Sequence, residues 1–224
     1  MGTVKQLFKL TGCFIVGFLI SKVAIAQPPF WKAIQDFKKK DSTVAPVPNS
    51  ILFVGSSSFT NWKDVSNYFP NYSIINRGFG GSTLVDVIRY TYDIILPYNP
   101  KQVVVYCGEN DFASSDSISA NTVVLRFKTL FGIIRTNLPQ AVIHYVSMKP
   151  SPARKKYRQK VEDANHQIKQ FLKKQKNAGY IDVYASMLNS NGHPKPEIFL
   201  SDSLHMNAQG YKIWQKIIEP KLVK

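Results

Sequence analysis

An α/β fold, with a parallel sheet between two layers of helices, is predicted by the order of apolar segments along the 224-residue chain. Five short runs rich in β-branched and aromatic residues alternate with longer segments whose apolar residues recur at helical spacing. The runs are almost continuously apolar, as strands covered on both faces are. Strands that alternate with helices form right-handed βαβ units, so we expect a three-layer α/β/α arrangement.

The expected strands are residues 51–54, 72–75, 102–106, 141–146 and 180–184. Helical spacing of apolar residues predicts helices within residues 84–95, 123–134 and 157–172. Residues 31–40 predict a short first helix, and the two prolines in residues 44–49 predict a loop after it. Asn207 is expected to cap a last helix, in which one face carries Tyr211, Trp214, Ile218 and Leu222.

Residues 1–26 differ from the rest of the chain. Lys5 and Lys9 precede an apolar run at residues 10–20, and small residues follow at 24–26. This order is typical of a secretory signal peptide, with cleavage expected before Gln27. The alternative is an uncleaved anchor, although the apolar run is shorter than the ~20 residues that span a bilayer. A secreted or periplasmic location after cleavage is therefore expected.

The composition is that of a folded, basic domain, because 44% of the residues are hydrophobic and the formal charge is +15. Loss of Lys5, Lys9 and Lys22 with the signal peptide lowers the charge to +12. Such a charge favours an anionic neighbourhood, so association with the envelope surface through the basic segments is one expectation. No nucleic-acid partner is expected, because the sequence has no base-reading module and no stacking platform.

Several motifs are absent from the sequence, and this narrows the chemistry. There is no phosphate-binding loop, no zinc-binding His-Glu-x-x-His and no cysteine pair, so we expect neither a cofactor nor a metal. The Gly-x-Ser-x-Gly elbow is also absent, since Phe59 occupies its last position. Cys107, the one cysteine left after cleavage, is expected to be a small buried hydrophobe.

Four polar segments follow predicted strands or precede the last helix. They are Gly55-Ser-Ser-Ser58, Asn76-Arg-Gly-Phe-Gly-Gly81, Gly108-Glu-Asn-Asp111 and Asp202-Ser-Leu-His205. Ligands of open α/β sheets bind outside the carboxyl ends of the strands, so these segments are expected to share one rim. Together they resemble, in order and approximate spacing, the four sequence blocks of the SGNH (GDSL-type) hydrolases. The resemblance extends from about Ile51 to the last helix and implies a five-stranded parallel, flavodoxin-like sheet.

The resemblance also implies roles for individual residues. Ser57 corresponds to the nucleophile, and Ser56 stands where the family commonly has aspartate. Asp202 and His205 correspond to the acid and the base of a catalytic triad. Activity is expected to survive the change at position 56, because that aspartate is no member of the triad.

The implied oxyanion donors are Ser57 and Gly81, through their backbone N–H groups, and the Asn110 side chain. Preorganised donors of this kind stabilise a tetrahedral intermediate by roughly 3 to 4 kcal/mol each. A serine hydroxyl also needs an imidazole that takes its proton and a carboxylate that holds this imidazole in one tautomer. The alternative for each residue alone is structural: Ser57 can cap a helix, and Gly81 and Asn110 can be turn residues.

The expected function is that of an exported serine esterase that hydrolyses carboxylic esters through an acyl-enzyme, with short O-acyl groups such as acetyl on carbohydrate as substrates. The alternatives are a lysophospholipase-type lipid acyl hydrolase and a binding module without turnover. Loops at residues 149–158 and 186–199 are expected to set the depth of the pocket. The expected domains are a signal peptide at 1–26, an N-terminal helix and loop at 27–50, and a hydrolase domain at 51–224.

Overall fold

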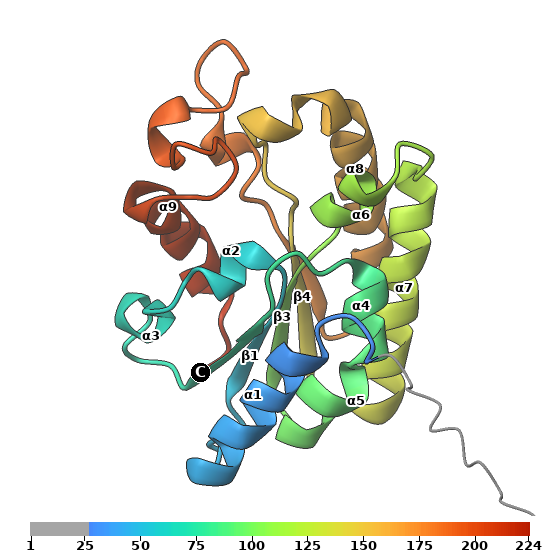
Figure 1. The fold of residues 1–224 in the computed structure, drawn as a ribbon, viewed down its shortest axis with the longest axis vertical. Helices are drawn as coiled ribbons and strands as arrows, with labels where there is room; N and C mark the ends of the chain where they lie inside the picture. Colours follow the sequence, from blue (N-terminus) through green and yellow to red (C-terminus); the bar gives the residue numbers. More distant parts are fainter. Residues whose placement is uncertain (1–26) are drawn as a thin grey trace, which may run out of the picture.

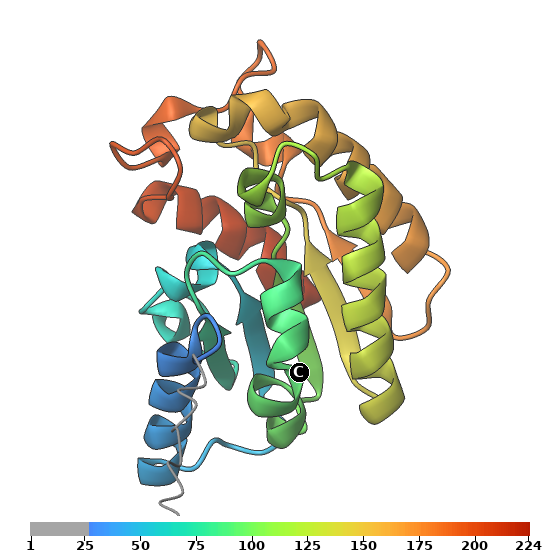
Figure 2. The ribbon, with the colours of Figure 1, turned by 45° about the vertical axis from the view of Figure 1, so that its right-hand side comes forward.

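The computed structural model describes residues 27–224 and confirms the predicted fold class. Five parallel strands form one sheet in the order β2-β1-β3-β4-β5, with helices on both faces (Figures 1 and 2). This is the flavodoxin-like order. The strands are β1 (Ile51–Gly55), β2 (Ile74–Gly78), β3 (Gln102–Tyr106), β4 (Val142–Val146) and β5 (Ala178–Ile181). The expected signal peptide lies outside the described residues.

Two apolar clusters cover the two faces of the sheet. The larger cluster lies under α1 (Trp31–Thr43), α4 (Leu84–Arg89), α5 (Thr91–Ile94), α7 (Ala120–Asn137) and α8 (Arg158–Leu172). The smaller cluster lies under α2 (Ser57–Thr60), α3 (Val65–Tyr68) and α9 (Ala208–Ile218). The remaining α-helix, α6 (Glu109–Ser114), follows β3. Alternate strand residues enter different clusters, as the pleat requires. Within residues 27–224 no helix is long and apolar enough to cross a membrane.

The second strand lies further along the chain than its apolar run predicted. It pairs with β1 from Ile51 opposite Ile74 to Gly55 opposite Gly78, so it includes the polar residues Asn76 and Arg77. These side chains find partners inside the protein: Asn76 Nδ2 donates to the Phe59 carbonyl over 2.7 Å, and Arg77 is only 4% exposed. Pairing with the neighbouring strand therefore outweighs the local loss of hydrophobicity.

Two further elements also differ from prediction. The fifth strand begins and ends earlier than residues 180–184, because its pairing with β4 runs from Ala178 to Ile181. The helix expected over residues 84–95 is divided into α4 and α5, and Tyr90 stands between them outside helical geometry. The Tyr90 hydroxyl donates to the Pro29 carbonyl over 2.7 Å, which ties this break to the N-terminal segment.

The end of β1 turns the chain toward the rim of the sheet. Gly55 has a φ of 139°, a conformation that favours glycine. A Cβ at this position would lie 1.9 Å from the Tyr106 carbonyl oxygen of the neighbouring strand, so no other residue fits. Ser56 follows as the N-cap residue of α2, and Ser57 is the first residue of that helix. The predicted nucleophile therefore stands at the carboxyl edge of the sheet, where ligands of such folds bind.

The N-terminal helix α1 is fixed to the domain by a buried polar cluster. The Arg77 guanidinium pairs with Asp41 of α1, and its Nε donates to the Tyr98 hydroxyl over 2.6 Å. The Tyr98 hydroxyl in turn donates to Asp41 over 2.5 Å. Ile34 of α1 is fully buried in the larger apolar cluster. Residues 27–50 therefore pack as part of the domain that follows them.

Candidate active site

Ser57 lies beside the glycine-rich loop that follows β2. The Phe79 N–H donates to the Gly55 carbonyl over 2.8 Å, which holds the start of this loop against the end of β1. A Cβ placed on Gly80 would lie 3.8 Å from the Ser57 Cβ, so the loop backbone is in contact with the serine. The structure thus brings the first and second predicted segments together.

Gly81 has a left-handed backbone, with a φ of 86°, and is exposed to solvent. Among residues 27–224 no backbone carbonyl accepts its N–H, whereas the next N–H, that of Ser82, donates to the Phe79 carbonyl over 3.3 Å. Ser57 starts α2, and the first N–H groups of a helix have no intrahelical partner. Both backbone donors predicted for the oxyanion are thus available for a ligand.

Asn110, in α6, reaches the same loop. Its Nδ2 donates to the Ser82 carbonyl over 3.1 Å, and the second amide hydrogen remains for another acceptor. The neighbouring Asp111 is fully buried, and its Oδ2 accepts from the Leu84 N–H over 2.9 Å. Burial raises the pKa of Asp111, against the hydrogen bond from Leu84 and the ion pair with Arg126. Asp111 therefore joins α6 to α4 and fixes the loop that carries Asn110.

Asp202 and His205 form a hydrogen-bonded pair within one turn of the chain. His205 Nδ1 lies 2.6 Å from Asp202 Oδ2, while Asp202 Oδ1 accepts from the backbone N–H groups of Leu204 and His205 at 2.9 Å each. These bonds, the one from the His205 backbone above all, lower the pKa of Asp202 to about 2. An ionised carboxylate at Nδ1 leaves Nε2 as the proton acceptor of a neutral imidazole.

The helix after His205 packs directly on α2. Asn207 caps α9 as predicted, because its side chain accepts from the N–H groups of Gln209 and Gly210. The Tyr211 hydroxyl of α9 donates to the Ser58 carbonyl over 2.9 Å, and the two helices lie side by side in Figure 1. Among the described residues no hydrogen bond joins the Ser57 hydroxyl to the imidazole, so their contact stays a prediction. Catalytic hydrogen bonds often tighten only when substrate binds.

Two other groups that could compete for the chemistry lie in or next to the sheet, one half-buried and one buried. His144 in β4 lies 2.6 Å from Gln102 Nε2, and burial lowers its pKa to about 4. Cys107 is buried as expected, and burial raises the pKa of its thiol well above the usual value. Neither is suited to act as a base or a nucleophile at the rim.

The segment after β4 contributes contacts that sequence reasoning missed. Arg154 Nη2 donates to Asn110 Oδ1 over 3.4 Å, and the Ala153 N–H donates to the Ser203 carbonyl over 3.1 Å. These residues connect the third predicted segment to the fourth. In the sequence, residues 154–160 read as a solvated basic face, and nothing in the residue pattern identifies a partner for Arg154.

A buried ion pair between Lys149 and Glu109 fixes the start of α6, next to Asn110. Lys149 Nζ donates to Glu109 over 2.8 Å and to the Tyr106 hydroxyl over 3.2 Å, and the Lys149 side chain is only 1% exposed. Glu109 precedes Asn110, so this pair holds the start of α6 against the end of β4. One feature of the sequence could have indicated this ion pair: Lys149 follows an apolar predicted strand by three residues, at the rim where the polar segments are expected.

Lys149→Met is expected to lower the free energy of unfolding by about 3 to 5 kcal/mol, because it leaves the Glu109 carboxylate buried without its partner. Chemical denaturation measures this change. The double variant Glu109→Leu/Lys149→Met removes both charges and is expected to recover most of the loss. A single variant as stable as the wild type would show that Glu109 is solvated or protonated without Lys149.

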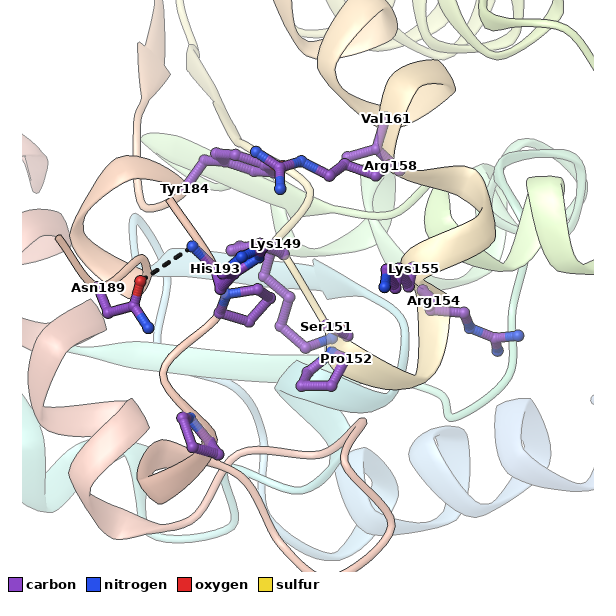
Figure 3. A pocket seen from close by; sticks show the side chains of 13 residues that line it. Lys149, Ser151, Pro152, Arg154, Lys155, Arg158, Val161, Tyr184, Asn189 and His193 are labelled. Carbon is purple, nitrogen blue, oxygen red and sulfur yellow. Dashed lines mark hydrogen bonds between the residues drawn. The ribbon is translucent and has the colours of Figure 1, made fainter. Parts of the chain in front are cut away.

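A pocket of about 420 Å³ is lined by residues of both loops expected to set its depth, whereas none of the predicted catalytic or oxyanion residues lines it (Figure 3). Tyr184 and Arg158 lie along one wall, and His193 lies near Lys149 on another. The remaining lining is rich in proline and basic residues, namely Pro150, Pro152, Pro194, Pro196, Arg154 and Lys155. Ala153, which stands between two lining residues, donates its N–H to the Ser203 carbonyl, so the segment that borders the pocket also contacts the turn of Asp202 and His205. Its volume is in the range of small-molecule sites.

The fold and the rim segments are those of an SGNH-type hydrolase. Residues 41–213 match the GDSL-like Lipase/Acylhydrolase family, and the chain belongs to this family. Family membership makes the protein a hydrolase that acts on esters, although the family does not by itself define the ester.

Individual relatives are more distant. The chain is 28% identical over 182 residues to the platelet-activating factor acetylhydrolase IB subunit alpha2 of Gallus gallus, covering 76% of this chain and 73% of the relative. A GDSL-like lipase from Bacteroides thetaiotaomicron superposes with a TM-score of 0.72 at 18% identity, covering 84% of this chain and 96% of that one. A variant of an acetyl-xylooligosaccharide esterase from Geobacillus superposes with a TM-score of 0.61 at 14% identity, covering 79% and 95%. At these identities the two structures show a shared fold.

Proposed function

We propose that the protein is an exported serine esterase that removes short O-acyl groups, acetyl above all, from carbohydrate through an acyl-enzyme. The observation that carries the proposal is the pair of Asp202 and His205, 2.6 Å apart, in the turn that leads into α9, the helix that packs against the helix of Ser57. Two backbone N–H groups fix one oxygen of the Asp202 carboxylate, which leaves the other oxygen to orient the imidazole.

In the proposed reaction the Ser57 hydroxyl attacks the ester carbonyl while His205 Nε2 takes its proton. The resulting oxyanion accepts hydrogen bonds from the N–H groups of Ser57 and Gly81 and from the Asn110 amide. His205 returns the proton to the alcohol oxygen as the ester bond breaks. Water then attacks the acyl-enzyme with His205 again as base, and the carboxylic acid and free Ser57 are released.

Carbohydrate acetyl esters are favoured by the pocket and the relatives together. In the proposed reaction the alcohol leaves on the side of His205, and Tyr184 in the pocket wall offers an aromatic face for a sugar. One structural relative is named as an acetyl-xylooligosaccharide esterase, and the chicken relative as an acetylhydrolase of platelet-activating factor. The second name also favours the alternative of a lipid acyl hydrolase. We propose a secreted or periplasmic location, based on the signal-like residues 1–26.

A series of p-nitrophenyl esters from acetyl to long acyl tests this function. The mature protein is expected to hydrolyse the acetyl ester fastest, with rates that fall as the acyl chain lengthens. Acetylated xylan and lysophospholipid as competing substrates separate the carbohydrate esterase from the lipid hydrolase. Hydrolysis of no ester would favour a binding module, and activity abolished by a chelator would reject the metal-free mechanism.

A further inference from the structure

The segment that precedes the family-matched region reaches the candidate active site. Phe30 lies just before α1, outside residues 41–213. Its ring nevertheless lies against the glycine-rich loop after β2, which carries the predicted oxyanion donor Gly81. A Cβ placed on Gly81 would lie 3.8 Å from the Phe30 Cε1, and the rings of Phe30 and Phe79 are 5.3 Å apart in an edge-on arrangement. The positive φ of 86° favours glycine at position 81, and the Phe30 ring lies within van der Waals reach of a side chain placed there.

Phe30 holds this position in a strained conformation. Its φ is 65° and its ψ is 4°, in the left-handed region that bulky side chains rarely adopt. Residues in such conformations persist only where their surroundings fix them, and they cluster at functional sites. Three contacts fix Phe30 and its neighbours. The Tyr90 hydroxyl donates a hydrogen bond to the Pro29 carbonyl, the Trp31 N–H donates to the Pro28 carbonyl over 3.1 Å, and the Phe79 ring packs edge-on against the Phe30 ring.

The two sides of Ser57 have different neighbours. Figures 1 and 2 both place α2 between the start of α1 and the loop that leads into α9. In the proposed reaction the alcohol oxygen must face His205 to receive its proton, so the acyl substituent points to the other side. That side is bounded by Gly81 and Phe30.

We propose that Phe30 forms the wall of the acyl subsite and limits it to small acyl groups. This proposal rests on the proposed esterase function and deepens it, because it assigns acyl selectivity to the N-terminal segment rather than to the pocket beside Tyr184. Removal of the ring opens space next to Gly81 for additional methylenes. A buried methylene is worth about fourfold in affinity, so two of them are worth about fifteenfold.

Phe30→Ala is therefore expected to raise the ratio of kcat/KM for p-nitrophenyl butyrate to that for the acetate by about fifteenfold. Phe30→Gly should change the ratio equally without loss of thermal stability, because glycine adopts the left-handed backbone freely. Phe37→Ala is the matched control, since Phe37 lies on α1 over Arg77, and its ratio should equal that of the wild type. An unchanged ratio in both Phe30 variants would overturn the proposal.

A binding experiment separates this proposal from the function on which it rests. NMR titration of acetate, butyrate and hexanoate into Ser57→Ala and into Ser57→Ala/Phe30→Ala requires no turnover. Tighter relative binding of the longer carboxylates in the double variant supports the acyl wall even if the wild type hydrolyses no ester. Identical chain-length preference in the two proteins rejects the wall, whether or not esters are hydrolysed.

Discussion

Ser57→Ala is expected to lower kcat for p-nitrophenyl acetate by about 10⁶-fold, the scale on which removal of a triad serine acts. Alanine at the start of α2 keeps the helix and the backbone N–H but removes the hydroxyl that is predicted to be the nucleophile. Steady-state hydrolysis measures the loss, with thermal unfolding to confirm that the variant is folded.

Ser58→Ala is the matched control for this change. Its hydroxyl is buried and has no hydrogen-bond partner among residues 27–224, so its removal should leave both activity and stability close to those of the wild type. If Ser57→Ala retained activity within tenfold of the wild type, another residue would be the nucleophile. The placement of the active site at the carboxyl edge of the sheet beside Ser57 would then be wrong.

Asp202→Asn is expected to lower kcat by about 10⁴-fold with little change in KM. An asparagine amide can donate to His205 Nδ1, which moves the imidazole proton to Nε2 and removes the acceptor for the Ser57 proton. The pH profile of the wild type tests the assignment in a second way. Because hydrogen bonds from the backbone and side chain of His205 lower the pKa of Asp202 to about 2, protonation of this carboxylate should not lower the rate at mildly acid pH.

Asp182→Asn controls for the loss of one surface carboxylate. Asp182 pairs with Lys169 over 3.2 Å at an exposed position, where such pairs contribute little. Its variant should keep the rate and the pH profile of the wild type. A loss smaller than tenfold in Asp202→Asn would show that the observed 2.6 Å contact does not orient the base.

Local features of the site could be predicted from the sequence because they are formed by residues close together in the chain. Asp202 and His205 are three residues apart, and one turn with a left-handed Ser203 is enough to join them. The cap of α9 by Asn207 likewise involves only the next three residues. Chain order and spacing carry this information without any knowledge of the fold.

A strand whose residues are all apolar and buried can be located from the sequence. The bounds of a strand that depend on pairing with its neighbour were predicted at the wrong residues. β3 was found at its true bounds because all five of its residues are buried. β2 was placed too early because Asn76 and Arg77 are polar and their partners lie in other elements.

The amino-acid sequence by itself determined the α/β class, the order of the elements and the Asp202–His205 turn, since hydrophobic periodicity and short spacing act locally along the chain. Only the tertiary structure decided which distant residues meet. Arg154 contacts Asn110 across 44 positions, Lys149 contacts Glu109 across 40, and Phe30 stands against Gly81. Such pairs depend on how the layers pack, and no periodic pattern in a single sequence records that packing.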